Sequence, residues 1–250
     1  MKWRQLFPFL VFLIGLLLAL FAGRALWTNW RDDIAARNEY ADLRESFERY
    51  LARANEAEPG IGGTEVDRNG PEATPRVDLS HFSELNPDFV GWISIPGTSV
   101  DYPVVQGRDN AFYLETTFMG EWNPAGSIFM DYRARQAFDT PVTVLYGHNM
   151  RDGSMFSALP DFLDPAFLRD HAEITILTAD GELLIYQIFH ARRADDRDLI
   201  GTLDFNDPAA ASFFESAPSG SNRFLILSTC PNDGDEHTRV LVYAALRIEG

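Results

Sequence analysis

The sequence contains only one cysteine, Cys230, in 250 residues. A single cysteine cannot form an intrachain disulfide, so no such bond stabilises the fold. The thiol is a buried core residue, a link between two chains or a nucleophile, and buried cysteines are the commonest of these. Outside the cytoplasm a lone thiol is exposed to oxidation, and there it becomes a stronger candidate for chemistry.

Positive charge is also scarce. The chain has 21 Lys and Arg against 37 Asp and Glu, which gives a formal net charge of −16. Nucleic-acid binding and a polybasic membrane patch both need clustered Lys and Arg, so the balance argues against both. A solvated acidic surface is the simplest interpretation.

The sequence shows no internal repeat and no pattern of metal ligands. The acidic stretch from Asp233 to Glu236 could attract a cationic amine or calcium, but its spacing is not that of an EF-hand loop. A solvated loop is the simpler interpretation. We therefore predict no metal site and no cofactor.

Charge is absent from residues 6–23, which are rich in Leu, Phe, Ile, Val and Ala. A run of this length can cross a bilayer as a helix. The alternative is a cleaved signal peptide. The candidate cleavage site before Gly23 does not fit the small-x-small pattern, because Leu20 stands where a small residue is needed. We predict an uncleaved N-terminal transmembrane anchor over residues 1–28.

Residues 29–79 form a second region with two parts. Apolar residues recur there every three or four positions, which predicts an amphipathic helix over residues 30–57: Ile34, Tyr40, Leu43, Phe47, Tyr50 and Leu51. This helix docks on the domain or stands off the membrane. Residues 58–76 are rich in Gly and Pro and predict a flexible linker.

The sequence pattern of residues 80–250 is typical of short strands separated by turns. About eight strands are predicted, at residues 89–95, 100–105, 126–131, 142–147, 172–178, 182–189, 224–227 and 238–246. One short helix is predicted at residues 207–215, with Pro208 in its first turn. A mainly β domain follows, either a closed barrel or a sandwich.

The strand at residues 224–227 delivers the polar pair Ser228 and Thr229 and then Cys230. After a short loop, Arg239 lies at the entrance of the next strand, so a hairpin would bring the thiol and the guanidinium together. A cysteine nucleophile usually needs a histidine partner.

His148 is the first candidate for that partner, because it follows a strand and Gly147 and so lies at the rim of the sheet. His237 is the rival, because it is close to Cys230 in sequence. His171 and His190 lie beside strands, which is typical of structural residues, and His81 lies in the approach to the domain. A rim histidine can also be simply solvated, and an arginine at a strand entrance can be simply an ion-pair residue.

These motifs together resemble the class B sortases. Residues 228–230 followed by Arg239 resemble the sortase active-site hairpin, and residues 146–149 resemble its histidine motif. Further stretches in the same order narrow the likeness to class B: residues 101–110 leading to Leu114, residues 125–133, and residues 152–156. The resemblance covers residues 80–250, and the acidic loop after Cys230 is where this chain departs from it.

The resemblance implies a fold and a reaction. The fold is an eight-stranded sortase-type β-barrel with short helices and an N-terminal helical extension. The enzyme is a cysteine transpeptidase that cleaves a sorting signal of the Asn-Pro-x-Thr-x kind after Thr. Cys230 is the implied nucleophile, His148 the acid and base, and Arg239 the residue that holds the substrate.

The resemblance also implies partners and a location. Surface proteins that carry the signal are the donors, and an amine of a peptidoglycan precursor or of a pilin is the acceptor. The catalytic domain lies outside a membrane that it joins through a single N-terminal helix. Candidate substrate-binding residues are Leu114, Asn149, Ser228 and Thr229.

Two other functions fit the same residues. A hydrolytic cysteine peptidase would use the same cysteine and histidine but would give the acyl group to water. A non-enzymatic, membrane-tethered β-barrel module would carry Cys230 as an inert residue.

Overall fold

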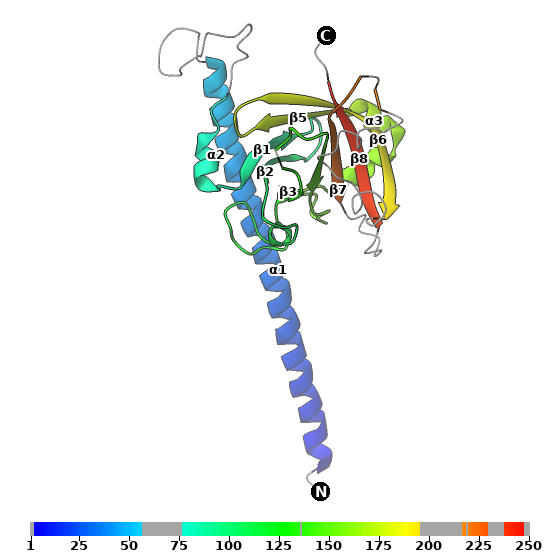
Figure 1. Ribbon diagram of the computed structural model, residues 1–250. Coiled ribbons are helices and arrows are strands. Elements are labelled where there is room, and N and C mark those ends of the chain that lie inside the picture. The colour runs from blue at the N-terminus through cyan, green and yellow to red at the C-terminus, as the bar shows by residue number, and fades with distance from the viewer. Residues whose placement is uncertain are drawn as a thin grey trace.

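Eight strands close into a barrel, and one long helix runs along its side (Figure 1). The structure is a computed structural model that describes residues 3–56, 77–135, 137–195, 217–218, 220–229 and 238–247. Its strands are β1 (Phe89–Ser94), β2 (Asp101–Val105), β3 (Ile128–Met130), β4 (Val142–Tyr146), β5 (Glu173–Thr178), β6 (Leu183–Asp195), β7 (Phe224–Thr229) and β8 (Thr238–Leu246). Its helices are α1 (Trp3–Glu56), α2 (Ser80–Leu85) and α3 (Pro165–Asp170), with 3-10 turns at Phe112–Leu114 and Leu159–Leu163.

The strand order around the barrel is β1-β2-β3-β4-β7-β8-β6-β5. Most neighbours are antiparallel, but β2 with β3 and β4 with β7 are parallel. The predicted mainly β class and the eight-stranded barrel are confirmed, and the sandwich alternative is wrong. The predicted strands match β1 to β8, except that β6 continues to Asp195, well beyond the predicted end at residue 189.

Strand β7 is buried along its whole length because both of its faces are covered. Leu225 and Leu227 belong to the main core inside the barrel. Their neighbours Phe224 and Ile226 point the other way and belong to a second cluster, which we call the outer apolar cluster: Val142, Val144, Phe224, Ile226, Leu241, Tyr243 and Ala245. The continuous apolar run predicted at residues 224–227 therefore reflects burial on two sides.

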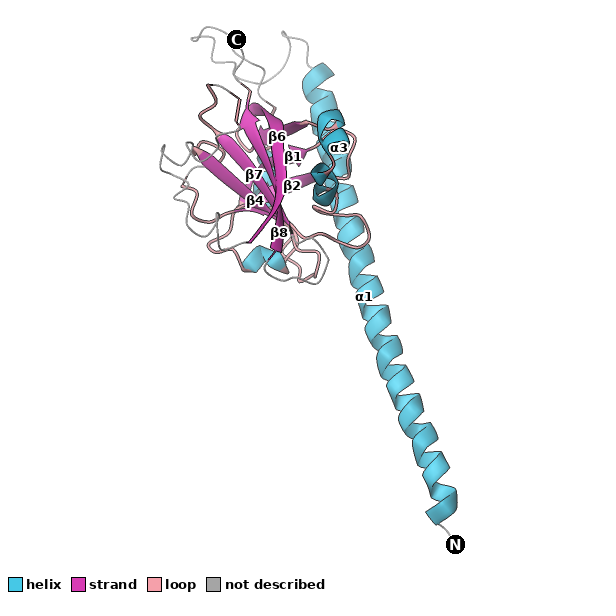
Figure 2. Cartoon of the chain, turned by 90° about the vertical axis from the view of Figure 1, so that its right-hand side faces the viewer, coloured by secondary structure: helices cyan, strands magenta, loops and turns pink. Residues whose placement is uncertain are grey.

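Helix α1 docks on the barrel through the predicted apolar positions. Tyr40, Leu43 and Phe47 are buried, and the Phe47 ring stacks on Trp92 of β1 with the ring centroids 4.1 Å apart. A helix is present over residues 30–56 as predicted, and of the two alternatives for it the structure shows the docked one; the helix begins at Trp3, far ahead of residue 30. Its N-terminal half projects away from the barrel (Figures 1 and 2).

The transmembrane anchor predicted for residues 1–28 finds no support in the structure. Within the described part of the chain, no helix is both long enough and apolar enough to cross a membrane. The linker predicted for residues 58–76 and the helix predicted for residues 207–215 lie outside the described residues.

Candidate active site

Strand β4 carries His148 to the rim of the barrel through Gly147. The Gly147 amide donates a hydrogen bond to the Ser228 carbonyl of β7 at 3.3 Å. A Cβ atom on Gly147 would lie only 2.4 Å from the Ile128 side chain and 2.8 Å from the Phe156 ring. Only glycine therefore lets the chain pass this close to its neighbours just before the histidine.

The imidazole of His148 is held by the main chain of another segment. Its Nε2 atom lies 2.7 Å from the Leu114 carbonyl oxygen. A carbonyl oxygen only accepts hydrogen bonds, so Nε2 carries the proton in this contact. Nδ1 is then the ring nitrogen that remains to exchange a proton with a reacting group.

Three neighbouring strands, β4, β7 and β8, bring the sequence positions of the predicted catalytic residues together (Figure 2). Tyr146 of β4 pairs with Ser228 of β7, and Thr229 of β7 pairs with Val240 of β8. His148 comes two residues after Tyr146, and Arg239 comes one residue before Val240. Cys230 directly follows Thr229 in sequence but lies outside the described residues, as do the acidic loop at 233–236 and His237.

Ser228, next to Thr229 on β7, and Arg239, at the start of β8, lie on the same face of the barrel wall. Side chains alternate along a strand, so Ser228 lies on the face of Ile226, and Arg239 lies on the face of Leu241. Ile226 and Leu241 both belong to the outer apolar cluster. Arg239 is half-buried, and one of its Nη atoms donates to the Thr238 carbonyl at 3.1 Å.

The predicted substrate-binding residues have different environments. Ser228 is only 2% exposed, and its hydroxyl has no hydrogen-bond partner among the described residues. The Thr229 hydroxyl donates to the Gly147 carbonyl at 2.7 Å, which fixes the end of β7 against the end of β4. Leu114 is 41% exposed beside His148, and Asn149 is half-buried in a bridge to Met155.

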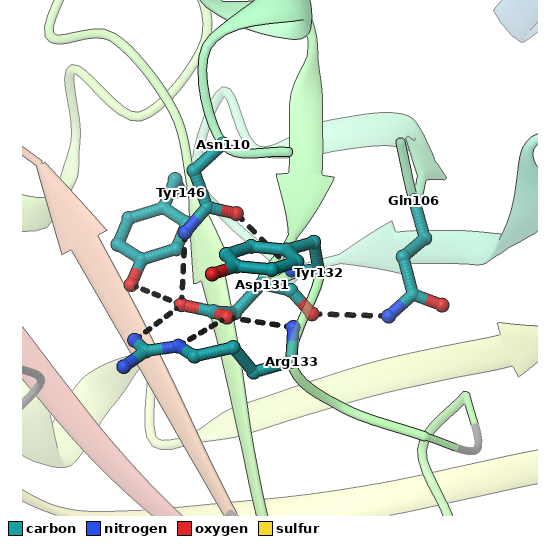
Figure 3. A network of polar contacts seen from close by, with 6 residues as sticks. All are labelled: Gln106, Asn110, Asp131, Tyr132, Arg133 and Tyr146. Atoms are coloured by element: carbon teal, nitrogen blue, oxygen red, sulfur yellow. Dashed lines mark hydrogen bonds and ion pairs between the residues drawn. The ribbon is translucent and has the colours of Figure 1, made fainter. Parts of the chain in front are cut away.

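A buried carboxylate lies below this rim, and the sequence motifs assigned it no role (Figure 3). Asp131 is fully buried and accepts hydrogen bonds from the Tyr146 hydroxyl at 2.8 Å and from the Asn110 amide at 3.0 Å. The Arg133 guanidinium donates to both of its oxygens, at 2.8 and 2.7 Å. Gln106 donates to the main-chain carbonyl of the same residue at 3.0 Å.

The ionisation of this network follows from its contacts. Burial by itself raises the pKa of Asp131, but the hydrogen bonds from Arg133, Tyr146 and Asn110 outweigh it and hold the pKa below its ordinary value. Burial and the adjacent carboxylate raise the pKa of the Tyr146 phenol, so its hydroxyl stays a donor. Because Tyr146 is two residues before His148, this network fixes the strand end that carries the histidine.

Within the described ranges, no group of three or more His, Cys, Asp or Glu side chains could hold a metal ion. Of the predicted catalytic set, the structure describes His148 and Arg239; a thiol paired with an imidazole is the set used for acyl transfer through a thioester.

Comparisons with known proteins identify the family. The family described as Sortase domain matches residues 93–247. Sortase B of Listeria monocytogenes is 34% identical over 183 residues, covering 68% of this chain and 74% of that protein. Sortase B of Staphylococcus aureus is 28% identical and covers 98% of each chain. A solved structure of a Staphylococcus aureus sortase B-substrate complex matches with a TM-score of 0.70 and 28% identity, covering 88% of this chain and 100% of that one.

The barrel and these matches together define the protein: the chain belongs to the sortase family. Its relatives and structural neighbours are class B sortases, as the sequence motifs predicted. It is accordingly a sortase-type transpeptidase, and the non-enzymatic alternative is wrong.

Proposed function

We propose that this chain cleaves a sorting signal of the Asn-Pro-x-Thr-x kind after Thr and transfers the acyl group to an amine. Cys230 is the nucleophile, His148 the acid and base, and Arg239 the residue that holds the substrate. The observation that carries the proposal is the strand register. If β7 continued for one residue, Cys230 would stand between Arg239 on β8 and the chain leading to His148 on β4.

The reaction begins when the Cys230 thiolate attacks the carbonyl carbon of the signal threonine. The C–N bond breaks, and the imidazolium of His148 gives its Nδ1 proton to the departing amine. A thioester remains on Cys230. An incoming amine then attacks the thioester, His148 takes up its proton, and the C–S bond breaks to restore the thiolate.

This scheme needs a thiolate and an imidazolium together, so only the correctly protonated fraction of the enzyme is active at any moment. The hydrogen bond to the Leu114 carbonyl supports this scheme. Nε2–H donates to that oxygen, which leaves Nδ1 to exchange a proton with the substrate. Arg239 would place a fixed positive charge near the oxygen that becomes negative during attack, and such donors contribute about 3 kcal/mol to barrier lowering.

The substrate lies along the outer face beside β4 and β7 in this proposal. Leu114 and Asn149 flank His148, and Ser228 lies on the outer face of β7 two residues before the nucleophile. Thr229, the other predicted binding residue on β7, holds the end of that strand to β4 through its hydroxyl. The Ser228 hydroxyl has no hydrogen-bond partner among the described residues, which supports a contact with the signal peptide, because a buried hydroxyl without a partner carries a free-energy cost that a ligand can remove.

The acceptor is an amine of a peptidoglycan precursor or of a pilin, and the donors are surface proteins that carry the signal. The strongly acidic composition of this chain favours an acceptor that is cationic before it reacts. Transfer to triglycine and to a lysine-containing pilin peptide, measured side by side, separates the two acceptor classes.

We also propose that residues 1–28 attach the enzyme to a membrane, with the catalytic domain outside. Large apolar side chains along α1 from Val11 to Phe21 are exposed, and Phe21 is 75% exposed. Exposed apolar surface on this scale favours contact with lipid. Sedimentation of the full chain with membranes, and loss of that behaviour on deleting residues 1–28, is the expected result. Recovery of the full chain free of membranes would contradict it.

The histidine assignment has a direct test with matched variants. His148→Ala should abolish cleavage of an Asn-Pro-x-Thr-x peptide, whereas His237→Ala should cleave it at the wild-type rate. The opposite pattern would assign the proton transfer to His237. Product analysis with triglycine present should show a ligated product, and only hydrolysed product would favour a peptidase.

A further inference from the structure

Helix α1 contacts the two loops on either side of His148. One loop, residues 112–127, contains Leu114, whose carbonyl oxygen accepts the hydrogen bond from His148. The other, the 149–155 hairpin, directly follows His148 and is closed by the bridge from Asn149 to Met155. Polar contacts join both loops to α1. The helix is therefore connected to the segment of each partner in the Leu114–His148 hydrogen bond.

The first contact runs through Tyr40, which is 4% exposed. Its hydroxyl donates to the Gly126 carbonyl at 2.6 Å and accepts from the Phe118 amide at 3.3 Å. Gly126 in turn lies directly against Leu114: a Cβ atom there would be 2.4 Å from the Leu114 carbonyl oxygen. Tyr40 therefore holds the piece of main chain against which that carbonyl rests.

The second contact runs through Arg37. Its Nε atom donates to Asp152 Oδ2 at 2.7 Å. The other oxygen of Asp152 accepts from the Ser154 amide at 3.0 Å, which shapes the tip of the 149–155 hairpin. The hairpin returns to His148 itself, because the Phe156 amide donates to the His148 carbonyl at 2.8 Å.

Packing alone does not fix this arrangement. A cavity of about 200 Å³ lies between α1 and the hairpin, lined by Arg37, Tyr40, Tyr102, Met150 and Asp152 among others. Packing here is partial: the Tyr40 and Tyr102 rings meet edge to face with their centroids 5.3 Å apart, and the cavity interrupts the contact between α1 and the hairpin. Polar contacts therefore help to set the distance between the helix and the two loops. The Asn123 amide donates to the Asp32 carbonyl at 2.7 Å, and the Met119 amide donates to Glu39 at 3.0 Å. The Tyr40 contact reaches Gly126, which lies against the Leu114 carbonyl, and the Arg37 contact reaches the hairpin that follows His148.

We propose that Arg37 and Tyr40 of α1 are positioning residues of the active site. They act through the two loops to hold the imidazole of His148 at the orientation that proton transfer requires. This inference rests on the proposed role of His148 in acyl transfer. It makes α1 a part of the catalytic apparatus as well as an appendage of the barrel.

The experiment uses the full chain, four variants in two matched pairs, and the conservative variant Arg37→Lys. Arg37→Gln and Tyr40→Phe remove the two polar contacts. Arg49→Gln is the control for the first, because the Arg49 hydrogen bonds stay within α1. Tyr50→Phe is the control for the second, because the Tyr50 ring stacks on His81 and its hydroxyl makes no hydrogen bond within the described residues.

Steady-state cleavage of an Asn-Pro-x-Thr-x peptide is the first readout. We expect kcat to fall about tenfold in Arg37→Gln and in Tyr40→Phe while KM stays within about twofold, because misplacement of a catalytic group lowers the rate of chemistry. Arg37→Lys should restore part of kcat, and both controls should match the wild type. Unchanged kcat in the two test variants would overturn the proposal.

The imidazole NMR signals of His148 are the second readout and do not depend on activity. The Nε2–H signal should shift or broaden in Arg37→Gln and Tyr40→Phe and should be unchanged in both controls. An unchanged signal in folded test variants would overturn the positioning role. If the wild type cleaves no such peptide, the proposed function fails, and the NMR comparison still decides whether α1 holds this histidine.

Discussion

Asp131 has no exposed surface, yet its carboxylate stays charged because Arg133, Tyr146 and Asn110 all donate to it. Such a buried charge is tolerated only when its hydrogen bonds are complete. The resulting cluster joins β3 to the end of β4, two residues before His148. At the scale of single residues, the site is thus supported by a polar network as well as by apolar packing.

Asp131→Asn should lower the free energy of unfolding by about 3 kcal/mol at pH 7, because it leaves the Arg133 charge without its partner. We place the value at the low end of the usual range because the Arg133 side chain is 33% exposed. Urea unfolding measures it, with Asp42→Asn on the exposed face of α1 as the control. Equal midpoints for wild type and Asp131→Asn would contradict the network.

The stability difference between the wild type and Asp131→Asn should depend on pH. The pKa of Asp131 is lower in the folded chain than in the unfolded chain, where it is about 3.9. Its contribution to stability is therefore fully present above that value and is lost as the pH falls through the lower, folded pKa. The stability difference between wild type and Asp131→Asn should shrink below about pH 4, and a constant difference would contradict the shift.

At the scale of elements, the parallel pair β4 and β7 is the central feature of the site. The pair joins residues 82 positions apart, such as Tyr146 and Ser228, and is reinforced where the Thr229 hydroxyl meets the Gly147 carbonyl. Strand β8 completes it on the other side of β7. Each of the three strands has a residue of the proposed catalytic set within two sequence positions of one end: His148 after β4, Cys230 after β7 and Arg239 as the second residue of β8.

Thr229 and Ser228 have separable roles in this arrangement. Thr229→Val should cost about 1 kcal/mol of stability with KM unchanged, because it removes a hydrogen bond between strands. Ser228→Ala should cost no stability, because the hydroxyl has no partner within the described residues, and should raise KM for the signal peptide. Urea unfolding and steady-state kinetics on both variants check this. A rise in KM for Thr229→Val at full stability would instead place Thr229 against the substrate.

The sequence alone predicted the strands and the position of His148. Short apolar runs with turn residues between them predicted all eight strands, and the end of β4 marked His148, because alternation and turns are local properties. Strand order, barrel closure and the parallel pairing of β4 with β7 depend on contacts between distant residues, so no local pattern contains them. The Asp131 network was missed for the same reason: Asn110 and Tyr146 are far apart in sequence and meet only in the fold.

At the scale of the whole molecule, α1 and the barrel share one core. Phe47 packs between Trp92 of β1 and Phe82 of α2, so the helix is not an independent unit. The sequence predicted the docking face but not the continuity of the helix back to Trp3. Helical periodicity reveals a buried face only where apolar and polar residues alternate around the helix. Residues 6–23 are uncharged, so their pattern does not show that they continue the same helix.

Phe47→Ala should lower the free energy of unfolding by about 3 to 5 kcal/mol, because it leaves a cavity between α1 and the barrel. Unfolding should stay a single transition when followed by circular dichroism and by tryptophan fluorescence. Trp30→Ala, at an exposed position on the same helix, should leave stability unchanged. Separate transitions for the helix and the barrel in the wild type would contradict a shared core.

The central claim is that Cys230 carries the acyl group. Its most direct test is mass spectrometry of the full chain after brief incubation with an Asn-Pro-x-Thr-x peptide and no amine acceptor. The account predicts an adduct with the mass of the peptide up to threonine on the fragment containing Cys230, and no adduct and no cleavage in Cys230→Ala. Cleavage retained in Cys230→Ala, or an adduct on any other residue, would contradict it.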